Sequence, residues 1–387
     1  MGTHDGGATQ TAWRELLDVL RDADESFLDG SRGAFDADDV ALGYRNLASV
    51  LAFAFGMYMR VDREWPVFQA SPKDPPGEKM LGEHPDVHYQ WAAIRGDRRY
   101  RITGQRGDEA YLSFTAHRGT RGSGFDQQFD GHLNHHDLVT DADGRFEIVV
   151  AAERADDCPN WLAIGPDVNE IYARAYHLDP LHDRTATYAI EPIEPPRPLA
   201  LDDAEVAARL HQMATVVRDV TFAMPQPLTD PNTIGELWQI DGTGPSRMWT
   251  ARDNVYNRGV FSLEPDQALV IEGVVVPCDY WSIQLWSPFL ASGDARRHRV
   301  TINSAQASLG RVASSGSRSC ATTRRSRAST SSAPPVVARA RSSSGGCARA
   351  RRRRCRRVVS CPSTTFASVL AHDPAWNGSV VGRAAVR

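Results

Sequence analysis

The sequence has few lysines, no cysteine pairs and no long apolar segments. Only two of its 44 basic residues are lysines, Lys73 and Lys79, and this preference for arginine is expected of a GC-rich gene. Of the six cysteines, only Cys158 and Cys278 precede residue 310, and none forms a Cys-x-x-Cys pair. Neither a disulfide framework nor a cysteine zinc site is therefore predicted, and a reducing compartment fits.

No targeting segment or membrane span is predicted. Residues 1–10 are polar and residues 13–28 are amphipathic and acidic, whereas a signal peptide is basic and then uniformly apolar. The most apolar run, Leu47–Met59, is shorter than the roughly 20 residues that cross a bilayer, so we expect it to be a buried helix. The expected location is the cytoplasm.

Charge is divided unevenly along the chain. From Arg311 onward there are sixteen arginines, no lysine and a single acidic residue, Asp373. The preceding residues hold 28 of the 44 basic and 47 of the 48 acidic residues, a net charge of −19. Such an acidic body is a poor partner for nucleic acid or an anionic membrane. Nucleic-acid binding is expected only if the arginine-rich tail is genuine.

Helical spacing of apolar residues predicts three helices. The first covers residues 11–30 and ends at Gly30; the third covers residues 201–222, with Asp202 or Asp203 near its start. The second is capped by Asp38 or Asp39. Its predicted buried stripe consists of Val40, Tyr44, Leu47, Leu51, Ala54, Phe55 and Tyr58.

Between the helices the apolar pattern has a period of two, which indicates strands. Tyr100–Gly104 and Tyr111–Thr115 flank a Gly107-Asp108 turn and are predicted to form a hairpin, and a second pair is predicted around Asp143-Gly144. Strands resume at residues 267–273 and 280–286. We expect an α+β protein whose main part is an antiparallel β-sandwich.

The two strand regions resemble each other at an offset of 169 positions, which favours an internal duplication. The matching residues are Asp97 and Asp266, Ile102 and Ile271, Gly104 and Gly273, Tyr111 and Tyr280, and Ser113 and Ser282. The alternative is that any two hairpins share such residue types. The expected organisation is N-terminal helices in 1–62, a first β module in 63–200, a linking helix in 201–225, an incomplete second module in 226–306 and a disordered, low-complexity tail in 307–387.

The tail has a composition that cannot bury enough apolar surface to fold, since it is rich in serine, alanine and arginine and includes Arg351–Arg354. A GC-rich back-translation of Ala321–Ala348, read in another frame, gives a peptide similar to Asp156–Tyr176. We therefore predict a frameshift between about residues 306 and 320. The alternative is a disordered, arginine-rich tail that binds nucleic acid.

Several short motifs resemble the bacterial family called domain of unknown function 1214. They are Asp143-Gly144, Asn160-Trp161-Leu162 and Arg174-x-Tyr176 in the first copy, and Tyr280-Trp281-Ser282 in the second. The resemblance covers about residues 85–306, discontinuously. It implies a β-sandwich or jelly-roll-like module with no established reaction.

Aromatic and polar residues in these motifs are candidates for ligand binding. An indole face stacks on rings or sugars while an amide fixes orientation. Arg174 and Tyr176 share one face of a strand and can bind an anion, although a structural cross-strand pair is the commoner use of such residues. The candidate ligand-binding residues are Asn160, Trp161, Arg174, Tyr176, Tyr280 and Trp281.

A histidine-rich segment supplies the catalytic candidates, His135, His136 and Asp137, and the metal candidates, His132 and His135. A further metal ligand, such as His84 or His88, would have to come from the proline-rich loop. In an extended segment His135 and His136 would point to opposite sides, so at most one of them would join His132. Phosphate-loop, zincin and hydrolase motifs are missing, so no cofactor is expected. The sequence leaves the oligomeric state open.

Two functions therefore remain. The first is a binding or accessory module for a small polar or sugar-like ligand, and the second is an enzyme that uses His135 or His136 as acid–base with Asp137 orienting it.

Overall fold

The computed structural model describes fifteen parts of the chain, which form two compact units. Unit 1 contains the described residues within 1–31, 36–225 and 240–252; unit 2 contains those within 32–35, 226–239 and 253–387. The described residues are 7–27, 36–71, 79–199, 201–222, 233–239, 249–261, 263, 269–275, 278–295, 297–307, 309–312, 318–322, 336–342, 365–371 and 383–386.

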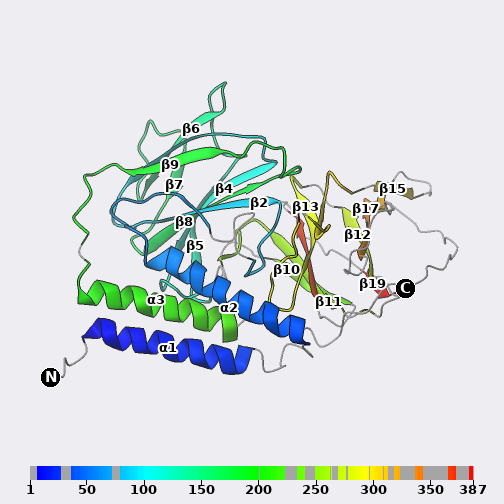
Figure 1. Cartoon of the computed structure of the whole chain (residues 1–387). Coiled ribbons are helices and arrows are strands. Elements are labelled where there is room, and N and C mark those ends of the chain that lie inside the picture. The colour runs from blue at the N-terminus through cyan, green and yellow to red at the C-terminus, as the bar shows by residue number, and fades with distance from the viewer. Residues whose placement is uncertain are drawn as a thin grey trace. The chain divides into compact units, whose positions relative to one another are not determined.

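Three helices and several mainly antiparallel sheets make up the described residues, which confirms the α+β class (Figure 1). The helices belong to unit 1 and are α1 (Ala8–Phe27), α2 (Ala37–Tyr58) and α3 (Asp203–Phe222). α3 packs against both α1 and α2. The predicted end of the first helix at Gly30 lies outside the described residues.

Aspartates fix the starts of all three helices. The carboxylate of Asp203 accepts hydrogen bonds from the backbone N–H groups of Ala8 (2.8 Å) and Thr9 (3.1 Å), so the first residue of α3 also caps α1. Asp202 accepts from the N–H of Glu205 (2.9 Å). α2 is capped by Asp36, with Asp39 completing a capping box, so the predicted caps at Asp38 or Asp39 are displaced by two or three residues.

The buried face of α2 differs from the predicted stripe. Tyr44 and Phe55 are 50% and 47% exposed, whereas Val50, Phe53 and Met57 are buried. The helix is apolar on nearly all sides, so the periodicity alone did not determine which side faces the core. The apolar residues left outside the core become part of the candidate site described below.

α2 also has the length and hydropathy of a membrane span, because the apolar run Leu47–Met59 belongs to a longer helix of 22 residues. A core helix of a soluble protein passes the same test. Phe53, Ala54, Met57 and Tyr58 are buried inside unit 1, while 39% of the apolar window as a whole is buried.

Unit 1 contains two sheets. Sheet A has the strand order β1-β2-β8-β4-β5 and sheet B the order β7-β6-β3-β9. All their pairings are antiparallel except that of β6 with β7. The strands are β1 (Gln69–Ala70), β2 (Val87–Ala93), β3 (Tyr100–Gln105), β4 (Tyr111–Arg118), β5 (Gln128–Asn134), β6 (Arg145–Ala151), β7 (Trp161–Ala163), β8 (Val168–Tyr176) and β9 (Thr187–Pro192).

The two predicted hairpins are wrong. β3 and β4 flank Gly107-Asp108 as expected, but β3 pairs with β6 and β9 in sheet B while β4 pairs with β5 and β8 in sheet A. The strand after Asp143-Gly144, β6, pairs with β3 and β7. Alternation of apolar residues identifies a strand but does not identify its neighbour, and these turns carry the chain from one sheet to the other.

The inner faces of sheets A and B share one apolar core. Leu112, Phe114 and Ile171 of sheet A pack with Ile148 and Leu162 of sheet B. All nine residues of β8 are buried, because its inner side faces this core and its outer side is also covered. The outer side therefore has to satisfy its polar groups inside the protein.

Unit 2 contains two five-stranded sheets with the orders β10-β11-β18-β13-β14 and β15-β16-β17-β12-β19. β12 and β17 are parallel, and the other pairings are antiparallel. Most of the predicted tail, 307–387, lies outside the described residues. The strands are β10 (Thr233–Gln239), β11 (Val255–Phe261), β12 (Leu269–Val275), β13 (Trp281–Trp286), β14 (Thr301–Asn303), β15 (Leu309–Val312), β16 (Arg318–Thr322), β17 (Val336–Ser342), β18 (Thr365–Ala371) and β19 (Arg383–Val386).

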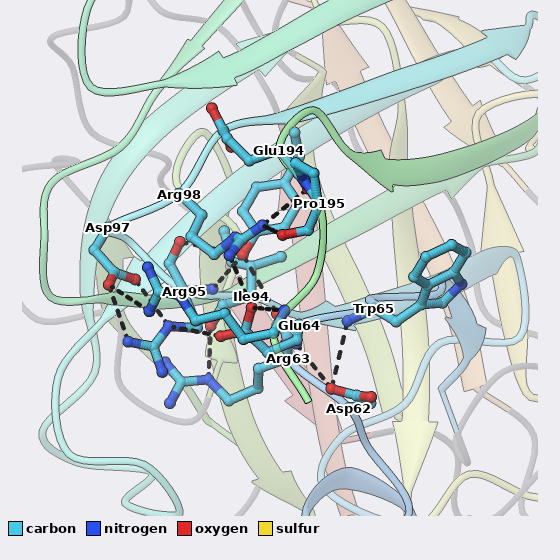
Figure 2. Close-up of polar contacts among 12 residues, drawn as sticks. Asp62, Arg63, Glu64, Trp65, Ile94, Arg95, Asp97, Arg98, Glu194 and Pro195 are labelled. Carbon is cyan, nitrogen blue, oxygen red and sulfur yellow. Dashed lines mark hydrogen bonds and ion pairs between the residues drawn. The ribbon is translucent and has the colours of Figure 1, made fainter. Parts of the chain in front are cut away.

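A buried ion pair ties the exit of α2 to the turn between β2 and β3 (Figure 2). Glu64 lies 2.9 Å from Nη1 of Arg98 and 3.3 Å from Nε of Arg95. Arg98 also donates to the carbonyl oxygens of Glu194 (2.9 Å) and Pro195 (2.7 Å), beyond β9. Three separate segments thus meet at the Glu64–Arg98 pair.

Replacing Glu64 by Gln is expected to destabilise the protein by about 3 kcal/mol, because the Arg98 side chain is only 4% exposed and loses its counter-ion. Chemical denaturation measures the change. Glu147→Gln is the matched control: it breaks the exposed pair with Arg101 and is expected to cost less than about 1 kcal/mol. Equal losses in the two variants would contradict this account.

Candidate functional site

A cavity of about 670 Å³ lies in unit 1 between α1, α2 and the edge of sheet A. Cavities of this size hold small molecules in other proteins. Most of its lining is apolar. The lining residues are Trp13, Leu16, Leu17, Leu20, Ala48, Leu51, Ala52, Phe55, Gly56, Met57, Arg60, Gln69, Ala70, Ser71, Trp91 and Met213.

The cavity exists because α1 and α2 each carry more apolar surface than the core needs. α1 buries Leu16 and Val19 while placing Trp13 and Leu17, four residues apart, on the adjoining side. Trp13 is 50% exposed, Leu17 42% and Phe55 of α2 47%. A surface of large, half-exposed apolar side chains is typical of a binding groove.

Apart from the tryptophans, three lining residues have polar side chains: Arg60, Gln69 and Ser71. Arg60 follows the end of α2, and it is the one charged residue among the described residues that line the cavity. Gln69 and Ser71 come from β1, a two-residue edge strand, and from the position after it. The cavity thus combines apolar walls with one cation and two neutral hydrogen-bonding side chains.

The floor of the cavity connects with a buried polar layer. The indole of Trp91 faces the cavity and donates through Nε1 to Glu170 (2.9 Å). Trp249 donates to the other carboxylate oxygen of Glu170 (2.6 Å). Burial is the main cause that raises the pKa of Glu170, and the two indole hydrogen bonds oppose it. Beside it, Sδ of Met57, which also lines the cavity, lies 3.9 Å from the Tyr172 hydroxyl.

This layer is the outer face of sheet A, where alternate residues of β4 and β8 stand in register. His117 pairs with Glu170, Thr115 with Tyr172 and Ser113 with Arg174. All of these side chains are buried. Desolvation holds the pKa of His117 well below its ordinary value, so its ring is neutral.

Sequence reasoning found Arg174 and missed Glu170. The available signal was the spacing Glu-x-Tyr-x-Arg within one strand, which places Glu170, Tyr172 and Arg174 on the same face. Arg174 is 2% exposed, and its guanidinium lies over the Tyr172 ring, 4.9 Å from the centroid. Tyr176 packs edge-on against Tyr111 with ring centroids 5.4 Å apart.

Asn160 and Trp161 use their polar groups within the fold. The Asn160 amide donates to the carbonyl oxygens of Val139 (2.8 Å) and Glu147 (2.9 Å) and accepts from the N–H of Val139 (2.7 Å). Trp161 donates through Nε1 to the carbonyl oxygen of Ala151 (2.9 Å). Asn160 is 2% exposed, so it joins β6 and the segment before it rather than facing a ligand.

Tyr280 and Trp281 belong to unit 2. Tyr280 is 3% exposed. Trp281 is 8% exposed and packs in an apolar cluster with Phe261, Leu269, Ile271 and Ile283. The hydrophobic core of unit 2 therefore accounts for the indole of Trp281.

The histidine-rich segment ends β5 in a turn, so the extended chain in which His135 and His136 would point to opposite sides does not occur there. Their ring centroids are 4.1 Å apart, because the chain is not extended there. His136 and Asp137 are exposed. Nδ1 of His132 lies 3.0 Å from the Thr115 hydroxyl. None of these residues lines the cavity between α1 and α2.

Comparison with known proteins establishes the fold alone. A crystal structure of an uncharacterized protein from Burkholderia cenocepacia has a TM-score of 0.74 and 23% identity, covering 98% of each chain. The VPA0106 protein of Vibrio parahaemolyticus has a TM-score of 0.42 and 9% identity, covering 96% of this chain and 100% of its own. The chain matches no family model and no curated protein.

The Burkholderia structure confirms that this architecture occurs in an uncharacterized bacterial protein. At 23% identity, this similarity shows a shared fold and does not show a shared activity. The resemblance to domain of unknown function 1214 is not confirmed, since no family model matches.

His84 predicts how stability depends on pH. It is 2% exposed, and burial lowers its pKa to about 4. Between pH 6.5 and 4 the unfolded chain holds a proton on His84 that the folded chain lacks, so stability falls as the pH falls. The full effect is about 3 kcal/mol.

The variant His84→Asn keeps an acceptor for the backbone N–H of Asp86, which donates to Nδ1 of His84 (3.0 Å). We expect its stability to fall less steeply than that of the wild type between pH 6.5 and 4, as measured by urea denaturation at several pH values. His298→Asn, at an exposed position with no ion pair among the described residues, is the control for loss of a histidine. Identical slopes for His84→Asn and the wild type would refute the assignment.

Proposed function

We propose that this protein binds a small amphipathic anion in the cavity between α1 and α2. The observation that carries the proposal is the lining itself: large apolar side chains, the neutral polar side chains of Gln69 and Ser71, and the single cation Arg60. Among the described residues Arg60 forms no ion pair, which leaves its charge available to a ligand. An apolar body would lie along the helices, with its anionic end at Arg60.

Size and exposure support this ligand class. A volume of about 670 Å³ suits a medium-length acyl chain or a fused ring system. A ligand that covers Trp13, Leu17 and Phe55 would remove half-exposed apolar surface from water, which is worth roughly 25 cal/mol per Å² before the costs of binding. A sugar suits this cavity less well, because its hydroxyl groups would face apolar side chains that offer no hydrogen bonds.

The proposal keeps a binding role and changes the ligand expected from the sequence. A polar or sugar-like ligand at Asn160 and Trp161 is less well supported, because the polar groups of both residues bond to the backbone. An enzyme that uses His135 or His136 with Asp137 is also less well supported, because these residues lie outside the cavity. We propose a cytoplasmic binding or accessory protein.

Displacement of the fluorescent anion 1-anilinonaphthalene-8-sulfonate by decanoate tests the site. Wild-type protein is expected to bind decanoate saturably. Leu17→Glu is expected to weaken decanoate binding at least tenfold, since it places a carboxylate among apolar side chains where the ligand lies. Leu181→Glu, at a 76% exposed position outside the cavity, is the matched control and is expected to bind as the wild type does.

Decanol, which has the same chain length and no charge, distinguishes the contribution of the apolar lining to binding from that of Arg60. Arg60→Gln is expected to weaken decanoate about fivefold, corresponding to about 1 kcal/mol, and to leave the affinity for decanol unchanged. An equal effect on both ligands would contradict the role of Arg60. Unchanged decanoate binding by Leu17→Glu would show that decanoate does not bind in this cavity.

We also propose that units 1 and 2 derive from a duplicated module related to domain of unknown function 1214. The proposal is supported by strand order: β1-β2-β8-β4-β5 in sheet A corresponds to β10-β11-β18-β13-β14. The offset of 169 relates β3 to β12 and β4 to β13. It also puts the counterpart of β8 at residues 337–345, yet β18 (Thr365–Ala371) has that place in the sheet.

A frameshift would explain this displacement, because the segment that should supply the central strand would be read out of frame. Resequencing the gene from the codon for Val300 to the stop codon is expected to reveal one base gained or lost, after which the restored frame encodes an Asp-Asp-Pro turn and an alternating strand. An unchanged reading frame would contradict the frameshift, and the arginine-rich tail would then have to be explained as genuine.

A further inference from the structure

Arg174 is a buried cation held mainly by neutral groups. It is 2% exposed and lies near the end of β8. Its Nη2 donates to the backbone carbonyl oxygens of Trp249 (2.5 Å) and Thr250 (3.4 Å). The guanidinium also lies against the Tyr172 ring. These contacts orient the side chain and supply no full negative charge.

No carboxylate of the described residues forms an ion pair with Arg174, and its Nη1 has no hydrogen-bond partner among them. The closest acidic residue along β8, Glu170, bonds to the indoles of Trp91 and Trp249. A buried charge without a bonded counter-ion costs several kcal/mol. Native proteins rarely retain such a group unless something else satisfies it.

Ser113 presents a second unsatisfied group beside Arg174. The two residues are direct register partners on β4 and β8, and both side chains lie on the outer face of sheet A. Ser113 is completely buried, and its hydroxyl oxygen has no hydrogen-bond partner among the described residues. A buried N–H donor and a buried hydroxyl therefore stand side by side.

The charge balance of this layer points in the same direction. Glu170 interacts electrostatically with both Arg121 and Arg174, and Arg121 interacts with Glu205 as well. Nε and Nη2 of Arg121 are also buried without hydrogen-bond partners. His117 adds no further positive charge, because burial holds its pKa well below the ordinary value and its ring is neutral. Arg174 therefore shares its one electrostatic carboxylate partner on β8, Glu170, with Arg121.

We propose that the outer face of sheet A binds a small oxyanion through Nη1 of Arg174 and the hydroxyl of Ser113. A carboxylate or phosphate oxygen accepts from both groups and supplies the missing negative charge. The site is distinct from the cavity between α1 and α2, whose lining includes neither residue. The oxyanion site can therefore be tested independently of the proposed binding of an amphipathic anion.

Isothermal titration calorimetry of the full chain with inorganic phosphate and with acetate, at constant ionic strength, tests the site and identifies the preferred oxyanion. Wild-type protein is expected to bind at least one of them saturably. Ser113→Ala is expected to weaken that binding about fivefold through loss of one hydrogen bond. Arg174→Gln is expected to abolish it. Arg145→Gln, at a 61% exposed side chain, is the control and is expected to bind as the wild type does.

Ser113→Ala decides the question if Arg174→Gln does not fold, because the smaller change buries no unpaired charge. Absence of saturable binding of both anions to the wild type would overturn the proposal. Equal affinities of the wild type and Ser113→Ala would also overturn it. Binding of decanoate in the α1–α2 cavity is expected to persist in Ser113→Ala, which separates failure of this site from failure of the cavity.

Discussion

The architecture of unit 1 depends on a strand that is buried on both faces. β8 lies at the centre of sheet A between β2 and β4, and all nine of its residues are buried. Its inner face is apolar and forms the core with sheet B. Its outer face carries Glu170, Tyr172 and Arg174, whose polar groups must be satisfied under cover. Trp91 and Trp249 meet that requirement for Glu170, and we propose that an oxyanion does so for Arg174.

The cavity follows from how the helices meet this sheet. α3 packs against α1 and α2, while an opening remains between α1, α2 and the sheet edge at β1. Both helices turn apolar side chains into this opening, among them Leu17 and Phe55. Trp91 belongs to both regions, since its ring lines the cavity and its N–H reaches Glu170. A ligand in the cavity would thus rest on a floor whose position is fixed by the buried polar layer.

Much of the local structure could be predicted from the sequence, whereas its tertiary arrangement could not. Helical spacing located all three helices, and alternation located β3, β4 and β6. Alternation could not assign strand partners. β3 and β4 have the pattern of a hairpin, and only the pairing of the other strands shows that they belong to different sheets. Because α2 carries apolar residues on nearly all sides, the sequence pattern could not predict which side is buried or that another side lines a cavity. Arg174 was recognised from its motif, but its hydrogen bond to the backbone of Trp249, 75 residues along the chain, depends on the tertiary structure.

A crystal structure of the protein grown with decanoate tests the central claim most directly. The account predicts electron density for an acyl chain between α1 and α2, against Trp13, Leu17 and Phe55, with the carboxylate at Arg60. Decanoate bound only elsewhere on the protein, or α1 packed directly against α2 with the cavity filled by side chains, would contradict it.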